Sequence, residues 1–189
     1  MKVKIAISTI FLFVLLSAAS LKTLFAEFNS STNPASIGTP VRSMVELGSV
    51  YSNIYDITIT VLETVRGQKA VAMLQKANKE NKKPPQGFDY LLVRVRFEMK
   101  GRAVSDTLSF GLGTEPLQWV ALTSDLMEYP QISVTLPQPA LIGSIKSGDS
   151  VEGWVAFAVD QKESGPVMVF DPDSGGATGR GRTLFFKLY

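Results

Sequence analysis

Short segments in which apolar and polar residues alternate recur along this sequence beyond residue 40. In the clearest of them, Tyr55, Ile57, Ile59 and Val61 alternate with three polar residues. A period of two places successive side chains on opposite faces of a β-strand. β-Branched and aromatic residues suit such a pleated, half-buried surface. The segment therefore predicts a strand with one face in a core and one face in solvent.

Further segments predict additional strands. Clear strands are expected at 55–61, 88–99, 151–159 and 183–189, and shorter ones at 41–47, 108–112, 117–122, 132–136 and 167–170. The segments are separated by turns rich in glycine and proline, which is typical of antiparallel architectures. Helices do not alternate regularly with these strands, so a parallel sheet is not expected.

One segment has helical periodicity. Within residues 69–81, apolar side chains recur at spacings of i, i+3, i+4 and i+7, which predicts one amphipathic helix. Pro84 and Pro85 then end it, because proline cannot continue a helix and also restricts the residue before it. The apolar stripe consists of Ala70, Met73, Leu74 and Ala77. Many short strands with one inserted helix predict a mainly β fold, an antiparallel β-sandwich.

Residues 1–26 have the pattern of an export signal. Lys2 and Lys4 precede an apolar stretch, and the small residues Ala18–Ser20 fit a cleavage site. The uncharged span 5–21 has 17 residues, which is the lower limit for crossing a membrane. A cleaved signal peptide and an uncleaved N-terminal membrane anchor therefore both remain open. Either one places the rest of the chain outside the cytoplasm, as a secreted or cell-surface protein.

The remaining chain divides into a flexible lead-in at 27–40, rich in Ser, Asn, Pro and Gly, and a domain at 41–189. The sequence contains no cysteine and no histidine. An exported domain without disulfides has to be stabilised by its core. The same absences remove thiolate nucleophiles, Ser-His-Asp triads and ordinary zinc sites.

The formal net charge of +2 belongs to the N-terminal segment. Three of the 19 basic residues and none of the 17 acidic ones lie in residues 1–26, so 16 basic residues remain beyond it. A domain this close to neutral lacks the basic footprint of a nucleic-acid-binding protein. We therefore expect no nucleic-acid partner.

The central part of the sequence resembles a known family. Residues 59–63, Arg66-Gly67 and the run 84–95 resemble a bacterial extracytoplasmic domain of unknown function, similar to the mycobacterial immunoprotective extracellular protein. Residues 148–157 resemble the penultimate strand of that family. The resemblance covers 33–189 and implies an immunoglobulin-like sandwich that is secreted or surface-attached. Many members carry a lipid-modified cysteine, which this chain lacks, and the family implies no catalytic residue.

Two segments near the C-terminus contain ligand-like groups. Asp171 and Asp173 precede a glycine turn and suggest calcium, but a calcium loop needs more donors in register. We favour a surface turn and leave calcium binding open. The stretch 175–181, with Arg180 and Arg182 nearby, suggests a phosphate cradle. It lacks the Lys-Ser/Thr ending and the following helix of a P-loop, so we favour a mobile hairpin connection.

Other polar residues have two explanations each. Asn78 and Asn81 either cap the helix, which we favour, or form a polar recognition surface. A basic strip either meets an anionic surface or, as we favour, is a solvated sheet face paired with acids. The strip consists of Lys82, Lys83, Arg94, Arg96, Lys100 and Arg102.

The two tryptophans, Trp119 and Trp154, are expected as core anchors, because sandwiches often bury a large aromatic residue between their sheets. The alternative is an exposed tryptophan beside Tyr129 that binds sugar or protein.

These features predict an exported, non-enzymatic module that binds protein, glycan or another cell-envelope component. A structural or accessory subunit of a membrane-associated complex, held by an uncleaved N-terminal helix, is the alternative. A hydrolase using carboxylates or a Ser-Lys pair comes third, because no spacing marks such a site. We assign no catalytic, cofactor-binding or metal-binding residue and expect no cofactor. Membrane contact is expected only through the N-terminal segment.

Overall fold

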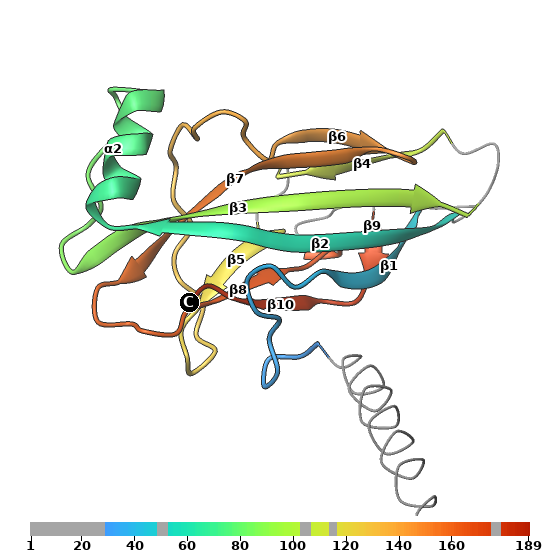
Figure 1. The fold of residues 1–189 in the computed structure, drawn as a ribbon, viewed down its shortest axis with the longest axis horizontal. Helices are drawn as coiled ribbons and strands as arrows, with labels where there is room; N and C mark the ends of the chain where they lie inside the picture. The colour runs from blue at the N-terminus through green and yellow to red at the C-terminus, as the bar shows by residue number, and fades with distance from the viewer. Residues whose placement is uncertain (1–28, 49–52, 103–106, 114–116, 175–178) are drawn as a thin grey trace, which may run out of the picture.

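The computed structural model describes residues 29–48, 53–102, 107–113, 117–174 and 179–189. The signal peptide or anchor expected at 1–26 lies outside the described residues. The described chain is mainly β, and its named strands pair antiparallel (Figure 1). Its elements are β1 (Val41–Leu47), β2 (Asn53–Arg66), α2 (Gln68–Ala77), β3 (Phe88–Gly101), β4 (Ser109–Leu112), β5 (Trp119–Leu122), β6 (Gly143–Lys146), β7 (Ser150–Asp160), β8 (Val167–Phe170), β9 (Gly179–Gly181) and β10 (Leu184–Lys187).

The largest sheet has five strands in the order β7-β3-β2-β1-β9. Its longest strands, β2 and β3, pair along their whole length, with a register shift between Val61 and Glu63. The alternation predicted for β2 is confirmed, because Tyr55, Ile57, Ile59 and Val61 are all almost completely buried. This face of the sheet therefore forms one wall of the core.

Two smaller sheets, β10-β8-β5 and β4-β6, close the same core. Phe97 of the large sheet, Phe110 of β4 and Phe170 of β8 pack together, with ring centroids 5.6 to 6.2 Å apart. Aromatic contacts of this kind add to the free energy gained by burying apolar area. The three rings therefore tie the three sheets into one apolar interior.

The opposite face of the large sheet is partly covered by α2. Leu74 of the helix packs with Leu92, Trp154 and other residues in a second, smaller apolar cluster. The predicted helix 69–81 ends earlier, at Ala77, because Asn78 has an extended backbone with φ −154°. In Figure 1 the helix lies at one end of the large sheet, and β1 and β9 lie towards the other.

One half-buried arginine, Arg66, connects this end of the sheet to later parts of the chain. Arg66 donates to the carboxylate of Asp89 at 3.1 Å and to the carbonyl oxygens of Asp160 and Glu163 at 2.6 and 2.7 Å. Its guanidinium also lies 5.5 Å from the ring centroid of Tyr189. The planar fork of arginine suits such multiple contacts, and it joins β2, β3, the turn after β7 and the chain end.

Most predicted strands are confirmed, and the boundaries of β1 and β8 agree with those expected at 41–47 and 167–170. The strand predicted at 132–136 is wrong. Ile132 and Val134 do alternate onto the α2 cluster, but no partner strand extends them into a ladder. Strands β6 and β9 were not predicted.

Residues 29–40, predicted as part of a flexible lead-in, lie along β10. The Ala35 amide donates to the carbonyl oxygen of Phe185 at 2.9 Å. The side-chain amide of Asn29 exchanges two hydrogen bonds, of 2.6 and 2.7 Å, with the backbone of the same phenylalanine. This part of the chain therefore lies between β10 and the start of β1, where it lines a surface hollow with Arg42 and Arg182.

Candidate binding groove at the edge of β1

Strand β1 has an open backbone edge over half its length. On one side it pairs with β2 from Val41 to Leu47. On the other side β9 pairs only with Val45–Leu47. Within the described chain, Val41–Met44 therefore have a partner strand on one side only.

Strand β9 ends at Gly181 because the chain then crosses to β10. A Cβ atom at Gly181 would lie 2.7 Å from the carbonyl oxygen of Met44, so only glycine fits this close approach. The sequence had favoured a hairpin connection at 175–181. That interpretation is wrong for Gly179–Gly181, which form an edge strand; residues 175–178 lie outside the described residues.

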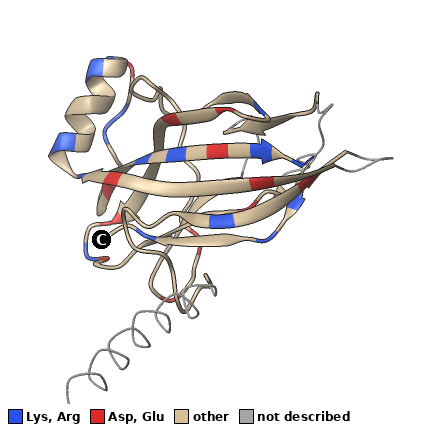
Figure 2. Ribbon diagram, turned by 45° about the vertical axis from the view of Figure 1, so that its right-hand side comes forward, with Lys and Arg blue, Asp and Glu red and all other residues tan. Residues whose placement is uncertain are grey.

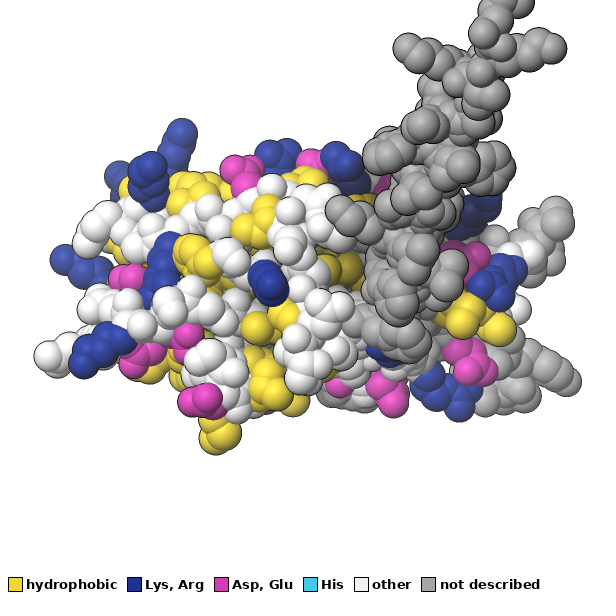
Figure 3. Space-filling view, turned by 60° about the horizontal axis from the view of Figure 1, so that its bottom comes forward, with side chains coloured by type: hydrophobic (Ala, Val, Ile, Leu, Met, Phe, Trp, Pro, Cys, Tyr) yellow, Lys and Arg dark blue, Asp and Glu magenta, His cyan; other side chains and the backbone are white. Residues whose placement is uncertain are grey.

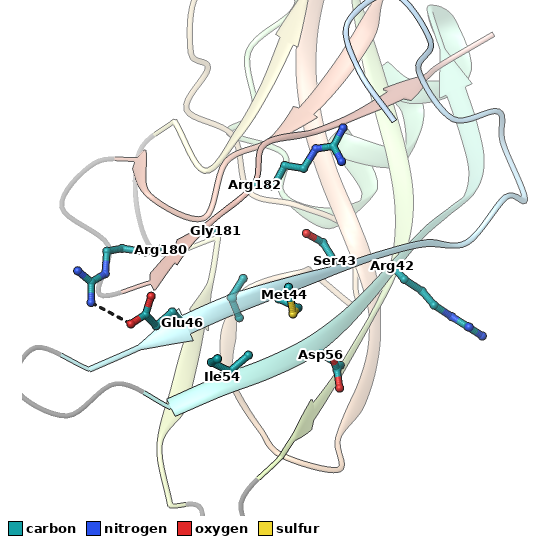
Figure 4. Close-up of a pocket in the computed structure, with 10 residues that line it drawn as sticks. Arg42, Ser43, Met44, Glu46, Ile54, Asp56, Arg180, Gly181 and Arg182 are labelled. Carbon is teal, nitrogen blue, oxygen red and sulfur yellow. Dashed lines mark hydrogen bonds and ion pairs between the residues drawn. The ribbon is translucent and has the colours of Figure 1, made fainter. Parts of the chain in front are cut away.

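A groove follows this open edge, and we call it the β1-edge groove. One part is a hollow of about 640 Å³ lined by Arg42, Met44, Ile54, Arg180 and other residues (Figure 4). A second part, of about 510 Å³, lies between β1, the lead-in and the start of β10. Both parts are lined by Arg42 and Arg182, so these two arginines mark where they join.

The floor of the groove is partly apolar. Met44 and Ile54 are 51% and 45% exposed, although they lie on strands whose other face is buried. They are diagonal neighbours across β1 and β2 on the same face, since Met44 pairs with Asp56 and Ile54 pairs with Glu46. Methionine is flexible and polarisable and adapts to different contacts. These two side chains therefore offer an apolar surface between charged groups.

Two of the arginines near the groove have a carboxylate partner. Arg102 binds Asp56 at 2.6 Å, and Arg180 binds Glu46 at 3.3 Å. The hydrogen bond from Arg102 lowers the pKa of Asp56 from its ordinary value, so this carboxylate is ionised at neutral pH.

The other two arginines, Arg42 and Arg182, have no carboxylate partner among the described residues. Arg42 makes no ion pair with any residue that the structure describes. Arg182 donates to the carbonyl oxygen of Asn29. Four arginines therefore face two carboxylates, and the groove carries an excess of positive charge at Arg42 and Arg182.

In the predicted basic strip on the sheet face, unlike in the groove, the arginines of β3 are paired with carboxylates. Arg94 binds Glu63 at 3.2 Å and Glu152 at 3.0 Å, and Arg96 binds Glu152 at 2.7 Å. Hydrogen bonding to Arg96 lowers the pKa of Glu152. Figure 2 shows acidic residues interspersed with the basic ones on these strands. The favoured interpretation, a solvated face paired with acids, is therefore confirmed for these arginines.

The two asparagines after the helix have structural roles. Asn81 donates to the carbonyl oxygens of Leu74 and Thr135 at 2.7 and 2.8 Å and accepts from the Thr135 amide at 2.8 Å. Asn78 donates to the Thr135 hydroxyl at 3.0 Å. The favoured capping role is confirmed for both, because Asn78 is the C-cap residue, whose backbone amide donates to the Leu74 carbonyl oxygen at 2.9 Å, and Asn81 binds the same oxygen through its side chain. Asn81 also fixes the 131–136 segment against the helix.

The alternative of an exposed tryptophan beside Tyr129 that binds sugar or protein is wrong. Trp119 lies in the main core and Trp154 in the cluster under α2, and each is 7% exposed. Tyr129 is equally buried and packs edge-to-face on Phe88 at 6.3 Å. None of these rings is available as a platform for sugar, and the favoured core role is confirmed.

The acidic turn near the C-terminus is a surface turn. Asp171 accepts a hydrogen bond from the Asp173 amide at 3.1 Å, and its carbonyl oxygen accepts one from the Ser174 hydroxyl at 3.0 Å. Among the described residues, no group of three or more acidic side chains is placed to hold a metal ion.

Figure 3 shows another face of the molecule, on which hydrophobic side chains are scattered among uncharged groups and basic residues lie mostly towards the borders. Single exposed apolar residues are normal for a protein surface. No helix within the described ranges has the length and apolar character needed to cross a membrane.

The chain matches no protein-family model and no curated protein in sequence. The solved structure of the yjhA protein of Bacillus subtilis is similar, with a TM-score of 0.51 and 14% identity over 82% of this chain and 99% of that one. The candidate lipoprotein ycdA of Bacillus subtilis has a TM-score of 0.44 and 15% identity over 69% of this chain and 36% of that one. The similarity to yjhA concerns the fold alone.

Proposed function

We propose that this protein is an exported, non-enzymatic module that uses the β1-edge groove to bind an anionic component of the cell envelope. The observation that carries the proposal is the pair Arg42 and Arg182, which have no carboxylate partner in the described part of the chain and line the same groove as the exposed Met44 and Ile54. Guanidinium groups make strong hydrogen bonds to anions. Adjacent apolar side chains add contact area, so the groove suits a ligand that combines both characters.

Export is supported by the sequence of residues 1–26, with its lysines, apolar stretch and small-residue exit. Because the chain has no cysteine, an extracytoplasmic domain has to be stabilised by packing instead of disulfides. The apolar core shared by the three sheets provides this packing. In this proposal the domain acts outside the cytoplasm, either released or anchored by its N-terminal segment.

An immunoglobulin-like sandwich is part of the same proposal. This part is supported by the arrangement of the sheets, because a five-stranded and a three-stranded antiparallel sheet pack against each other across one core. The resemblance of residues 33–189 to the extracytoplasmic family points in the same direction. Such folds host many functions, so the function rests on the groove and not on the fold.

A non-enzymatic role is supported by the groove's two carboxylates, Asp56 and Glu46, each of which is ion-paired to an arginine. A general acid needs a pKa near the working pH. The pKa of Asp56 is lowered by Arg102, which suits an ion-paired group and not a proton donor. The groove therefore offers groups that hold a ligand in place.

The test is a binding isotherm of the full-length chain in mild detergent with poly-L-glutamate at physiological salt. Arg42→Gln should weaken binding by about tenfold, the size expected for one hydrogen bond to a charged group. Arg96→Gln is the matched control, because Arg96 lies on the same sheet but is satisfied by Glu152. Equal loss in both variants, or no binding by the unaltered chain, would contradict the proposal.

A further inference from the structure

We propose, building on the function above, that the ligand is an extended acidic peptide segment that adds as a strand to the open edge of β1. Strand addition at a sheet edge is a recurrent mode of peptide recognition, in which backbone hydrogen bonds supply much of the affinity. The segment Val41–Met44 offers such an edge, because β9 stops at the residue that faces Val45.

The opposite edge of the same sheet shows how this protein covers an edge. On β7, the Trp154 amide donates to the Pro139 carbonyl oxygen at 2.9 Å, and the Leu141 amide donates to the Trp154 carbonyl oxygen at 3.0 Å. Unpaired strand edges favour unwanted association, and proteins usually block them. The edge of β1 is blocked by β9 over Val45–Leu47 and left open beside the groove.

The groove geometry fits a peptide backbone. In an antiparallel ladder, alternate residues of β1 direct their amide and carbonyl groups away from β2. A polyuronate such as polygalacturonate has no amide groups to pair with them. The incoming strand would continue the line of β9 along the same edge of β1, beginning where β9 ends at Gly181.

Charge and apolar character specify the peptide further. Arg42 and Arg182 line both parts of the groove and favour carboxylates near the added strand. Met44 lies on the outward face of β1, where it would contact an apolar side chain of the added strand, while Ile54 extends the apolar surface one strand further, on β2. The best ligand therefore carries an acidic and an apolar residue two positions apart, so that both lie on the same face of the added strand.

A second copy of this chain fits the edge less well. Pairing of two β1 edges would bring Arg42 and Arg182 of both copies close together. Like charges directly opposite each other in a sheet are destabilising. The charge of the groove therefore favours an acidic partner over self-association.

The experiment compares three probes on the full-length chain in mild detergent: a peptide repeating Glu-Ser-Val-Ser, which places Glu and Val on one face of a strand, the same peptide with alternate backbone amides N-methylated, and polygalacturonate. N-methylation keeps the charge but removes backbone donors. We expect the unmodified peptide to bind, the methylated peptide to bind at least about tenfold more weakly, and Arg42→Gln to weaken the unmodified peptide.

Equal affinity for both peptides would overturn strand addition. If polygalacturonate alone binds and its binding depends on Arg42, the peptide inference fails while the proposed function stands. If no anionic probe binds, both fail. Sedimentation with and without peptide tests self-association, since a dimer that the peptide does not dissociate would overturn the assignment of this edge to a peptide.

Discussion

Gly153 in β7 has a backbone neighbour too close for any side chain. A Cβ atom there would lie 2.4 Å from the Leu141 amide nitrogen and 2.6 Å from the carbonyl carbon of Ala140. That segment is held by its two backbone hydrogen bonds with Trp154. Gly153→Ala should therefore lower the free energy of unfolding by about 1–3 kcal/mol, as overpacking typically does.

Urea denaturation measures the effect of Gly153→Ala, and Gly165→Ala is its control. A Cβ atom at Gly165 would meet only the Glu163 carboxylate, at 3.9 Å. An unchanged urea midpoint for Gly153→Ala would show that residues 139–141 do not pack against the edge of β7.

Asn81 is a second residue whose chemistry is fixed by its partners. Its amide group satisfies the carbonyl oxygens of Leu74 and Thr135 while its oxygen accepts from Thr135. Asn81→Asp removes both donors and places a charge at a buried site, so we expect a loss of about 2–3 kcal/mol in unfolding free energy. Thermal denaturation checks this, with the exposed Gln86→Glu as the amide-to-acid control. Equal melting temperatures for the two variants would contradict this role of Asn81.

At the scale of elements, Glu163 joins two turns. Its carboxylate accepts from the Gly165 amide at 2.8 Å and the Ser124 amide at 3.1 Å, and these bonds lower its pKa below the ordinary 4.5. A carboxyl whose pKa is lower in the folded state stabilises the fold above its unfolded pKa. That contribution is lost as the pH falls through the lowered folded value.

We therefore expect Glu163→Gln to reduce stability at neutral pH and to flatten the loss of stability in acid. Urea denaturation of both proteins, from neutral pH down to below the folded pKa of Glu163, measures this. An identical pH dependence for the two proteins would show that the carboxylate does not join the turns.

The elements also show what the sequence can predict. β2, β3 and β7 are long enough for apolar alternation to define them, and α2 has a clear stripe. β6 and β9 are only four and three residues long, and they are strands because β4 and β1 lie beside them. The 132–136 segment has strand-like alternation but packs on a helix, so periodicity alone gave a wrong element there.

The groove was harder to predict because its residues are distant in the sequence. Arg42 and Arg182 are 140 positions apart, and only the pairing of β9 with β1 brings their segments together. In the sequence, Arg182 stands out only as a neighbour of the phosphate-cradle-like stretch 175–181. One usable signal existed: Met44 and Ile54 are apolar at positions where the alternation of β1 and β2 calls for polar residues.

At the scale of the whole molecule, export predicts a processed protein. The native protein should have a mass about 2–3 kDa below that of the full chain, because a secretory signal is removed at its small-residue site. Intact-mass spectrometry of the native protein measures this. A mass equal to the full 20.6 kDa would instead support a retained anchor and an accessory role at the membrane.

The most direct test of the β1-edge groove is NMR mapping of amide shifts during titration with the acidic peptide. The account predicts shifts concentrated at Val41–Met44, Ile54 and Arg180–Arg182, with the paired arginines of β3 unaffected. Shifts centred on α2 or on the Arg94 and Arg96 face, with none along the open edge of β1, would contradict it.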